Sequence, residues 1–157
     1  MLIQEAIAAL SAAQSIEKKA ISNHDVLNEA PRYGSAFSRG LRLEFGNFVV
    51  LLISGTASID EHGNTVHKGD FRGQLHRTFA NIAGLLGAEG ATWQDVVRTT
   101  CYLRDIERDY AAFNEERTKF YDDLGLNPYP ASTGIQAILC RSDLLIEIEA
   151  IAIFKKP

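Results

Sequence analysis

The clearest pattern in the chain is an alternation of apolar and acidic residues near its carboxyl end. In residues 145–154 every even position is apolar, whereas the odd positions include Glu147 and Glu149. Side chains of a β-strand alternate between the two faces of a sheet, so the pattern predicts a strand with one apolar face and both carboxylates on the other. Acids on such an apolar strand need a partner, water or a chemical task. Glu147 is therefore a candidate functional residue.

Hydrophobic periodicity predicts further helices and strands along the rest of the chain. Amphipathic helices are expected over residues 1–19, 70–86 and 108–124. Strands are expected at 41–45, 48–54 and 96–103, and two more within 129–154. Three local signals support these boundaries: Gly46-Asn47 as a hairpin turn, Asp70 as a helix N-cap and Gly125 as a C-terminal stop.

The order of these elements predicts an α+β fold with one mixed sheet and two main helices on one face. Residues 1–30 are expected to form an N-terminal helical extension and a connector, and residues 31–157 the main domain. The second face of the sheet would carry polar groups such as Glu147, yet too much apolar surface to lie in water. We expect this face to be buried against other subunits.

Composition narrows the class of protein. The 157 residues suit a single domain, and a hydrophobic content of 46% with a net charge of −4 is ordinary for a soluble chain with little affinity for nucleic acid. Cys101 and Cys140 lie in apolar runs, which favours buried, reduced thiols. The chain shows no apolar run of membrane-spanning length and no signal peptide at its start. A cytoplasmic protein that contacts no membrane is expected.

The candidate chemistry is limited. No phosphate loop, dinucleotide motif or metal-ligand spacing occurs, so neither a metal nor a cofactor is expected. The turn-rich loop at 31–40 places Arg32 and Arg39 beside Tyr33 and Phe37, which fits either an anion-binding wall or a solvated loop. Two roles for Glu147 fit the pattern. It could transfer a proton or position a water, or it could form a salt bridge at a subunit interface.

Four arginines outside that loop look like charges on solvated faces, although any of them could reach a neighbouring subunit. They are Arg98, Arg104, Arg108 and Arg117.

Several segments, taken together and in order, resemble the RidA family. They are residues 54–55, 70–74, 95–105 (DVVRTTCYLRD), 113–114 and above all 129–152. These proteins are enamine/imine deaminases once described as translation inhibitors of the endoribonuclease L-PSP type. The resemblance covers about residues 30–154 and implies a chorismate-mutase-like fold, a homotrimeric barrel and ligand clefts between subunits. It also implies hydrolysis of 2-aminoacrylate-type enamines or their imines to 2-keto acids and ammonia, without metal or cofactor.

The resemblance also assigns roles to individual residues. Glu147 would position water, whereas Gly55, Asn114 and the ring of Phe37 would shape the pocket. Thr133 and Gly134 follow the proline motif and would line the substrate site.

The motif departs from the family at one position, because Ser132 stands where the family has an arginine that grips the substrate carboxylate. A hydroxyl replaces neither the charge nor the fork of a guanidinium. Losing such a pair removes on the order of 2 kcal/mol from carboxylate binding. Arg39 is the expected substitute, with Arg32, Arg104 and Arg141 as alternatives.

The leading functional hypothesis is therefore a divergent RidA-type hydrolase for a small anionic enamine, imine or unsaturated carboxylate. The contrasting hypothesis is a non-catalytic trimer that binds a small ligand or contacts RNA. Residues 55–58 (GTAS) with 67–70 (HKGD) are also similar to stretches in chorismate-hydrolysing enzymes. The 2-aminomuconate-type deaminases are a further relative.

Overall fold

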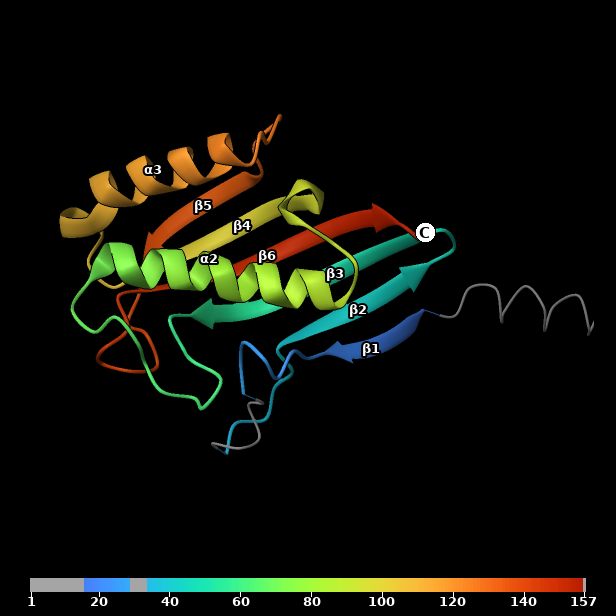
Figure 1. Cartoon of the computed structure of the whole chain (residues 1–157), viewed down its shortest axis with the longest axis horizontal. Helices are drawn as coiled ribbons and strands as arrows, with labels where there is room; N and C mark the ends of the chain where they lie inside the picture. The colour runs from blue at the N-terminus through green and yellow to red at the C-terminus, as the bar shows by residue number, and fades with distance from the viewer. Residues whose placement is uncertain (1–15, 29–33, 157) are drawn as a thin grey trace, which may run out of the picture.

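The structure is a computed structural model that describes residues 16–28 and 34–156. It consists of one six-stranded sheet with two long helices across one face, as Figure 1 shows. The strand order is β1-β2-β3-β6-β4-β5. The strands are β1 (Glu17–Ile21), β2 (Gly40–Phe45), β3 (Phe48–Ala57), β4 (Val96–Leu103), β5 (Ala131–Gln136) and β6 (Ile146–Lys155).

The helices are α2 (Phe71–Ala88) and α3 (Ile106–Asp123), and a short 3₁₀ helix, η2 (Trp93–Asp95), precedes β4. Neighbouring strands are antiparallel except β4 and β5, which run parallel and are joined through α3. A parallel pair needs such a crossover, and here it places α3 beside the β5 edge of the sheet. The predicted α+β fold is confirmed.

The predicted turn and cap residues are also confirmed. Gly46-Asn47 closes the β2–β3 hairpin, with Phe45 paired to Phe48 and a φ of 55° at Gly46. The Asp70 carboxylate accepts a hydrogen bond from the backbone N–H of Gly73 (3.0 Å) and so caps α2. The helix ends within two residues of the predicted position.

The core lies between the sheet and the two helices. The even positions of β6 from Ile146 to Ala152 are buried, as the alternation predicted, and pack with the buried residues of α2. The opposite face, which we call the helix-free face, carries Glu147 and Glu149. It also leaves large apolar side chains exposed, among them Phe48 (49%), Leu52 (37%) and Ile153 (43%).

The first predicted helix is wrong where the structure describes it, and residues 1–15 lie outside the described residues. Residues 17–19 belong to strand β1, where Glu17 pairs with Glu44 and Lys19 with Arg42. Pairing with the hairpin edge satisfies backbone groups of this segment and overrides its helical periodicity.

Periodicity predicts that Tyr110 and Leu124 lie on the buried side of the last helix and that Val97 shares a strand face with Cys101, and the apolar run around Cys140 predicts its burial. In the structure Val97, Tyr110, Leu124 and Cys140 are all exposed. A register irregularity between Val96 and Arg98 turns Val97 outward (44% exposed). Tyr110 and Leu124 of the α3 region are 48% and 41% exposed, because α3 lies over the sheet edge and buries only a narrow stripe. Cys140 lies in a loop and is exposed, and both cysteines are free thiols.

No helix in the described part of the chain is long and apolar enough to cross a membrane.

Candidate functional site

Glu147 lines a cavity of about 560 Å³ at one end of the sheet. Strand β6 holds it on the helix-free face, where it pairs with Ala57 of β3 and Tyr102 of β4. The predicted site residues Phe37 and Gly55 line the same cavity. The structure therefore brings together one group of the residues singled out from the sequence.

Gly55 allows the Glu147 carboxyl to lie directly over the backbone of β3. A Cβ at position 55 would overlap Oε1 of Glu147 and lie 3.0 Å from its Cδ. The strand is irregular at this point, since the β3–β6 register shifts between Ile53 and Thr56. A residue without a side chain thus allows the carboxyl to rest against the backbone.

The pKa of Glu147 is raised above the usual glutamate range. Burial is the main cause, the neighbouring charge of Glu149 adds to it, and the positive charge of Arg39 partly offsets it. A carboxyl whose pKa is shifted towards neutrality can take a proton from water more readily than an ordinary glutamate.

Arg39 is buried (5% exposed) and lines this cavity, and it forms two hydrogen bonds to Asn28. Its Nε donates to the Asn28 carbonyl (2.8 Å) and its Nη2 to Asn28 Oδ1 (3.2 Å), and its guanidinium lies 5.4 Å from the Phe37 ring centre. Arg39 therefore anchors the loop and supplies positive charge near Glu147.

The alternative arginines are engaged as well. Arg104 donates to the carbonyls of Leu144 and Arg141, and Arg141 donates to the Gly63 carbonyl (2.8 Å) while lining the Glu147 cavity. Arg32 lies outside the described residues.

The remaining predicted residues form a second group at the β5 edge. Nη1 of Arg117 donates to Oγ of Ser132 (3.0 Å), and Nη2 donates to Oδ1 of Asn114 (2.7 Å). The guanidinium lies 4.5 Å from the ring centre of the fully buried Phe113. Thr99 Oγ1 completes the group, 3.1 Å from Ser132 Oγ. An arginine of α3 thus holds the serine that replaces the motif arginine.

The other two motif residues lie on either side of this group. Thr133 points to the helix-free face and accepts a hydrogen bond from Nη2 of Arg98 (3.1 Å). A Cβ at Gly134 would meet only Cε2 of Tyr110, at an ordinary 3.8 Å. The exposed Tyr110 ring therefore forms a wall beside β5.

The two groups do not meet within one chain. Ser132 pairs with Thr99 of β4 on the helix-covered face, whereas Glu147 pairs with Tyr102 on the helix-free face. Thr99 and Tyr102 are three positions apart along β4, which is about 10 Å. Within one chain the two groups are therefore separated along the sheet and by its two faces.

Buried nucleophiles near Ser132 are not activated. Burial raises the pKa of the Cys101 thiol and raises the pKa of Tyr121 to about 12, and the positive charge of Arg117 only partly opposes both effects. Cys101 is 2% exposed, so its thiol is neither accessible nor ionised.

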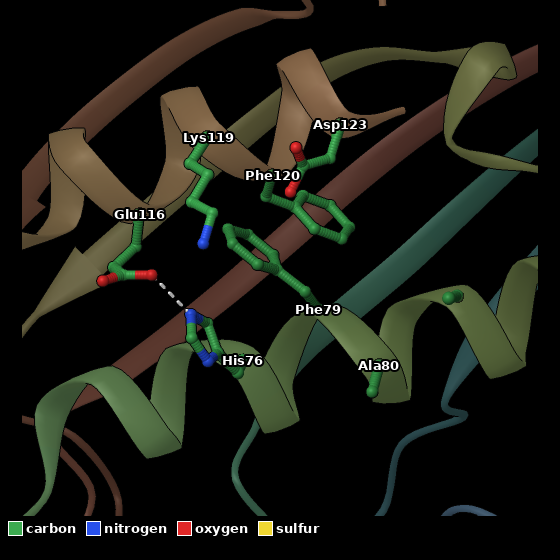
Figure 2. A pocket seen from close by; sticks show the side chains of 8 residues that line it. His76, Phe79, Ala80, Glu116, Lys119, Phe120 and Asp123 are labelled. Atoms are coloured by element: carbon green, nitrogen blue, oxygen red, sulfur yellow. Dashed lines mark hydrogen bonds and ion pairs between the residues drawn. The ribbon is translucent and has the colours of Figure 1, made fainter. Parts of the chain in front are cut away.

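A smaller cavity of about 310 Å³ lies between α2 and α3 (Figure 2). His76 faces Glu116 across it, with 2.6 Å between Nε2 and Oε2, above the stacked rings of Phe79 and Phe120. Hydrogen bonds from His76 and then Arg72 lower the pKa of Glu116. The Glu116 carboxylate of this cavity is thus held by its hydrogen bonds to His76 and Arg72, and we do not regard the cavity as the reaction site.

Sequence reasoning missed Arg117 and Tyr110. A signal for Arg117 was present, because Asn114 and Arg117 are three residues apart on a helix and share a face. Once Asn114 was a candidate, the cation beside it on α3 was a natural replacement for the missing arginine.

Comparisons with known proteins show the family and the fold of the chain. The family model described as Endoribonuclease L-PSP matches residues 28–154. RutC family proteins of Pyrococcus abyssi and Saccharolobus solfataricus are each 32% identical over 124 residues, which is 79% of this chain and 91% of theirs. The structure of Escherichia coli TdcF with bound serine is 23% identical, with a TM-score of 0.71 over 87% of this chain and 99% of that one. The chain therefore belongs to the endoribonuclease L-PSP family and is a RidA-type protein.

Proposed function

We propose that this protein is a hydrolase for a small anionic enamine or imine, with Glu147 positioning the attacking water. One observation carries the proposal: a half-buried carboxyl of raised pKa lies over a glycine in a cavity. The fold supports it, since the same fold holds a bound serine, a small carboxylate ligand, in E. coli TdcF.

The proposed reaction converts an enamine of a 2-amino acid to a 2-keto acid. Protonation of the enamine carbon gives the imine, water adds to the carbon of the C=N bond, and ammonia leaves as the carbonyl forms. One water is consumed and one ammonia released. The Glu147 carboxylate accepts a proton from the water as the C–O bond forms and returns it to the leaving nitrogen. Solvent supplies the proton that converts the enamine to the protonated imine and takes up the hydroxyl proton as the carbonyl forms, whereas Glu147 carries the proton from the attacking water to the leaving nitrogen.

The active form in this proposal is a homotrimer. Its support is that the Glu147 group and the Ser132 group lie on opposite faces of the sheet in one chain. The exposed apolar residues of the helix-free face give a second argument, because such a patch is typical of a subunit interface. Packing the sheets of three copies around one axis would bury this face and bring the two groups together from neighbouring chains.

Ammonia release from enzymatically generated 2-aminoacrylate tests the proposal. The wild-type protein should accelerate release over the uncatalysed rate, and Glu147→Gln should lower kcat roughly 10²- to 10⁴-fold, because the amide cannot accept a proton. Lys119→Ala, at the smaller cavity between α2 and α3, is the matched control and should retain full activity. A wild-type protein that does not accelerate release would refute the proposal.

A non-catalytic binding function is the second candidate, and Ser132 is the observation that favours it. Without the motif arginine, strand β5 retains the polar side chains of Ser132 and Thr133 but lacks the guanidinium that would bind a carboxylate most strongly. This candidate predicts that pyruvate, the product of 2-aminoacrylate hydrolysis, binds to a protein that does not accelerate ammonia release.

A further inference from the structure

We propose that Arg117 of α3 binds the substrate carboxylate in place of the arginine that Ser132 replaces. This inference rests on the proposed function for the identity of the ligand, a small carboxylate. It assigns the anionic end of the ligand to the Arg117 guanidinium, where α3 lies beside β5.

The position of the guanidinium is the first argument. Nη1 of Arg117 lies 3.0 Å from Oγ of Ser132. The positive charge of Arg117 therefore lies next to the position that an arginine occupies in the family motif. Nη2 lies 2.7 Å from Oδ1 of Asn114, a residue that the resemblance places in the pocket. The same charge therefore reaches the same place from a helix rather than from a strand.

The second argument is the hydrogen-bonding capacity that remains. A guanidinium has five N–H donors, and two of those on Arg117 are used, both by neutral oxygens. No carboxylate within residues 16–28 and 34–156 forms an ion pair with it, whereas Arg108 on the same helix is bound to Asp109 by two hydrogen bonds. Arg117 is half-buried, and a half-buried cation without an anion favours an anionic ligand.

The third argument is rigidity. The central carbon of the guanidinium lies over the Phe113 ring, 4.5 Å from its centre, and Phe113 is fully buried. Ser132 is held in turn by Thr99, and Thr99 is 1% exposed. Stacking and two hydrogen bonds fix the fork before a ligand arrives, which lowers the entropy cost of binding.

The other arginines fit this role less well. Arg39 donates to Asn28 and belongs to the Glu147 group, not to the Ser132 group. Arg98 contacts Thr133 on the helix-free face, away from Asn114. Arg117 contacts both residues that the family motif and the family pocket single out.

Binding of pyruvate and of pyruvamide, measured by isothermal titration calorimetry, tests the role without requiring turnover. Pyruvamide has the same shape and lacks the charge. Wild-type protein should prefer pyruvate, and Arg117→Ala should weaken pyruvate binding roughly 10- to 100-fold while changing pyruvamide binding less than about 3-fold. Lys119→Ala, which removes a cation two positions along α3, should leave both affinities unchanged.

Restoring the family arginine provides a rescue. The double variant Arg117→Ala/Ser132→Arg should recover most of the lost pyruvate affinity, because the guanidinium would return from β5. Arg117→Lys keeps the charge and loses the fork, so it should retain only part of the preference for pyruvate. If Arg117→Ala does not fold, the ratio of pyruvate to pyruvamide affinity in Arg117→Lys still tests the role of Arg117.

The possible outcomes separate the two proposals. If wild type accelerates ammonia release but Arg117 variants bind pyruvate as wild type does, the role of Arg117 is refuted and the hydrolase stands. If Arg117→Ala loses pyruvate binding and Ser132→Arg restores it while wild type does not accelerate release, the role of Arg117 stands and the hydrolase fails. If wild type does not distinguish pyruvate from pyruvamide, the carboxylate site itself is refuted.

Discussion

The Glu147 group and the Ser132 group differ in local structure and in the role proposed for each. Glu147 is on a central strand, and its carboxyl rests on a glycine where any side chain would collide. Ser132 is on an edge strand whose residues are all exposed, and its neighbour Gly134 has ordinary space around it. The group proposed for proton transfer is tightly constrained, whereas the group proposed for ligand binding has room for change. This difference explains how an arginine could move from a strand to a helix while the glutamate stayed in place.

Breaking the contact between chains should have the largest effect. Leu52→Asp places a charge in the apolar helix-free face, so the protein should become monomeric and lose all ammonia release. Light scattering coupled to size exclusion gives the mass, and the ammonia assay gives the activity. As a control, Lys18→Asp on the exposed outer strand should change neither. A monomeric Leu52→Asp variant with full activity would contradict a site shared between chains.

The two glycines sharpen the comparison, with an intermediate effect. Gly55→Ala must displace the Glu147 carboxyl, and a shift of about 1 Å at a catalytic group can lower the rate on the order of 10²-fold. Gly134→Ala adds the same methyl group in open space beside Tyr110 and should alter kcat/KM less than about 3-fold. Steady-state kinetics of both variants give the result. Equal losses would show that the groups are constrained alike.

The pH dependence of stability should give the smallest effect. Because the folded state raises the pKa of Glu147, it binds that proton more tightly than the unfolded chain does. The free energy of unfolding therefore falls as the pH rises above the pKa of Glu147 in the unfolded chain. It stops falling once the pH has passed the raised pKa of the folded state. Glu147→Gln removes this loss of stability, so its Tm should exceed that of wild type by on the order of 2 °C at pH 7.

At pH 4, where Glu147 is protonated, the difference in Tm between Glu147→Gln and wild type should be close to zero. Differential scanning calorimetry at several pH values follows this trend. A variant that is less stable than wild type at pH 7 would indicate that Glu147 forms a stabilising ion pair instead.

Much of the fold followed from the sequence, because local signals agreed with one another. The alternation in β6, the Gly46-Asn47 turn and the Asp70 cap each have a short-range physical cause, and all three are confirmed. Residues 17–19 and Val97 were mispredicted because pairing to a neighbouring strand and a register irregularity decide their positions. These are contacts between segments distant in sequence, which periodicity does not report.

The candidate site was predictable only in part for a similar reason. Gly55 and Glu147 were identified together, and the structure shows them in contact. The separation of Glu147 from Ser132 depends on strand order and on which face each side chain takes. The arginine beside Ser132 comes from a helix fifteen residues earlier in the chain, so a motif read along one strand could not supply it.

The outermost strand bears on how this protein avoids aggregation. Strand β1 closes one side of the sheet, and its Glu17, Lys18 and Lys19 are exposed. A further strand that paired with this side would have to bring its backbone against one acidic and two basic side chains. Strand β1 thus discourages open-ended pairing of sheets into fibrils.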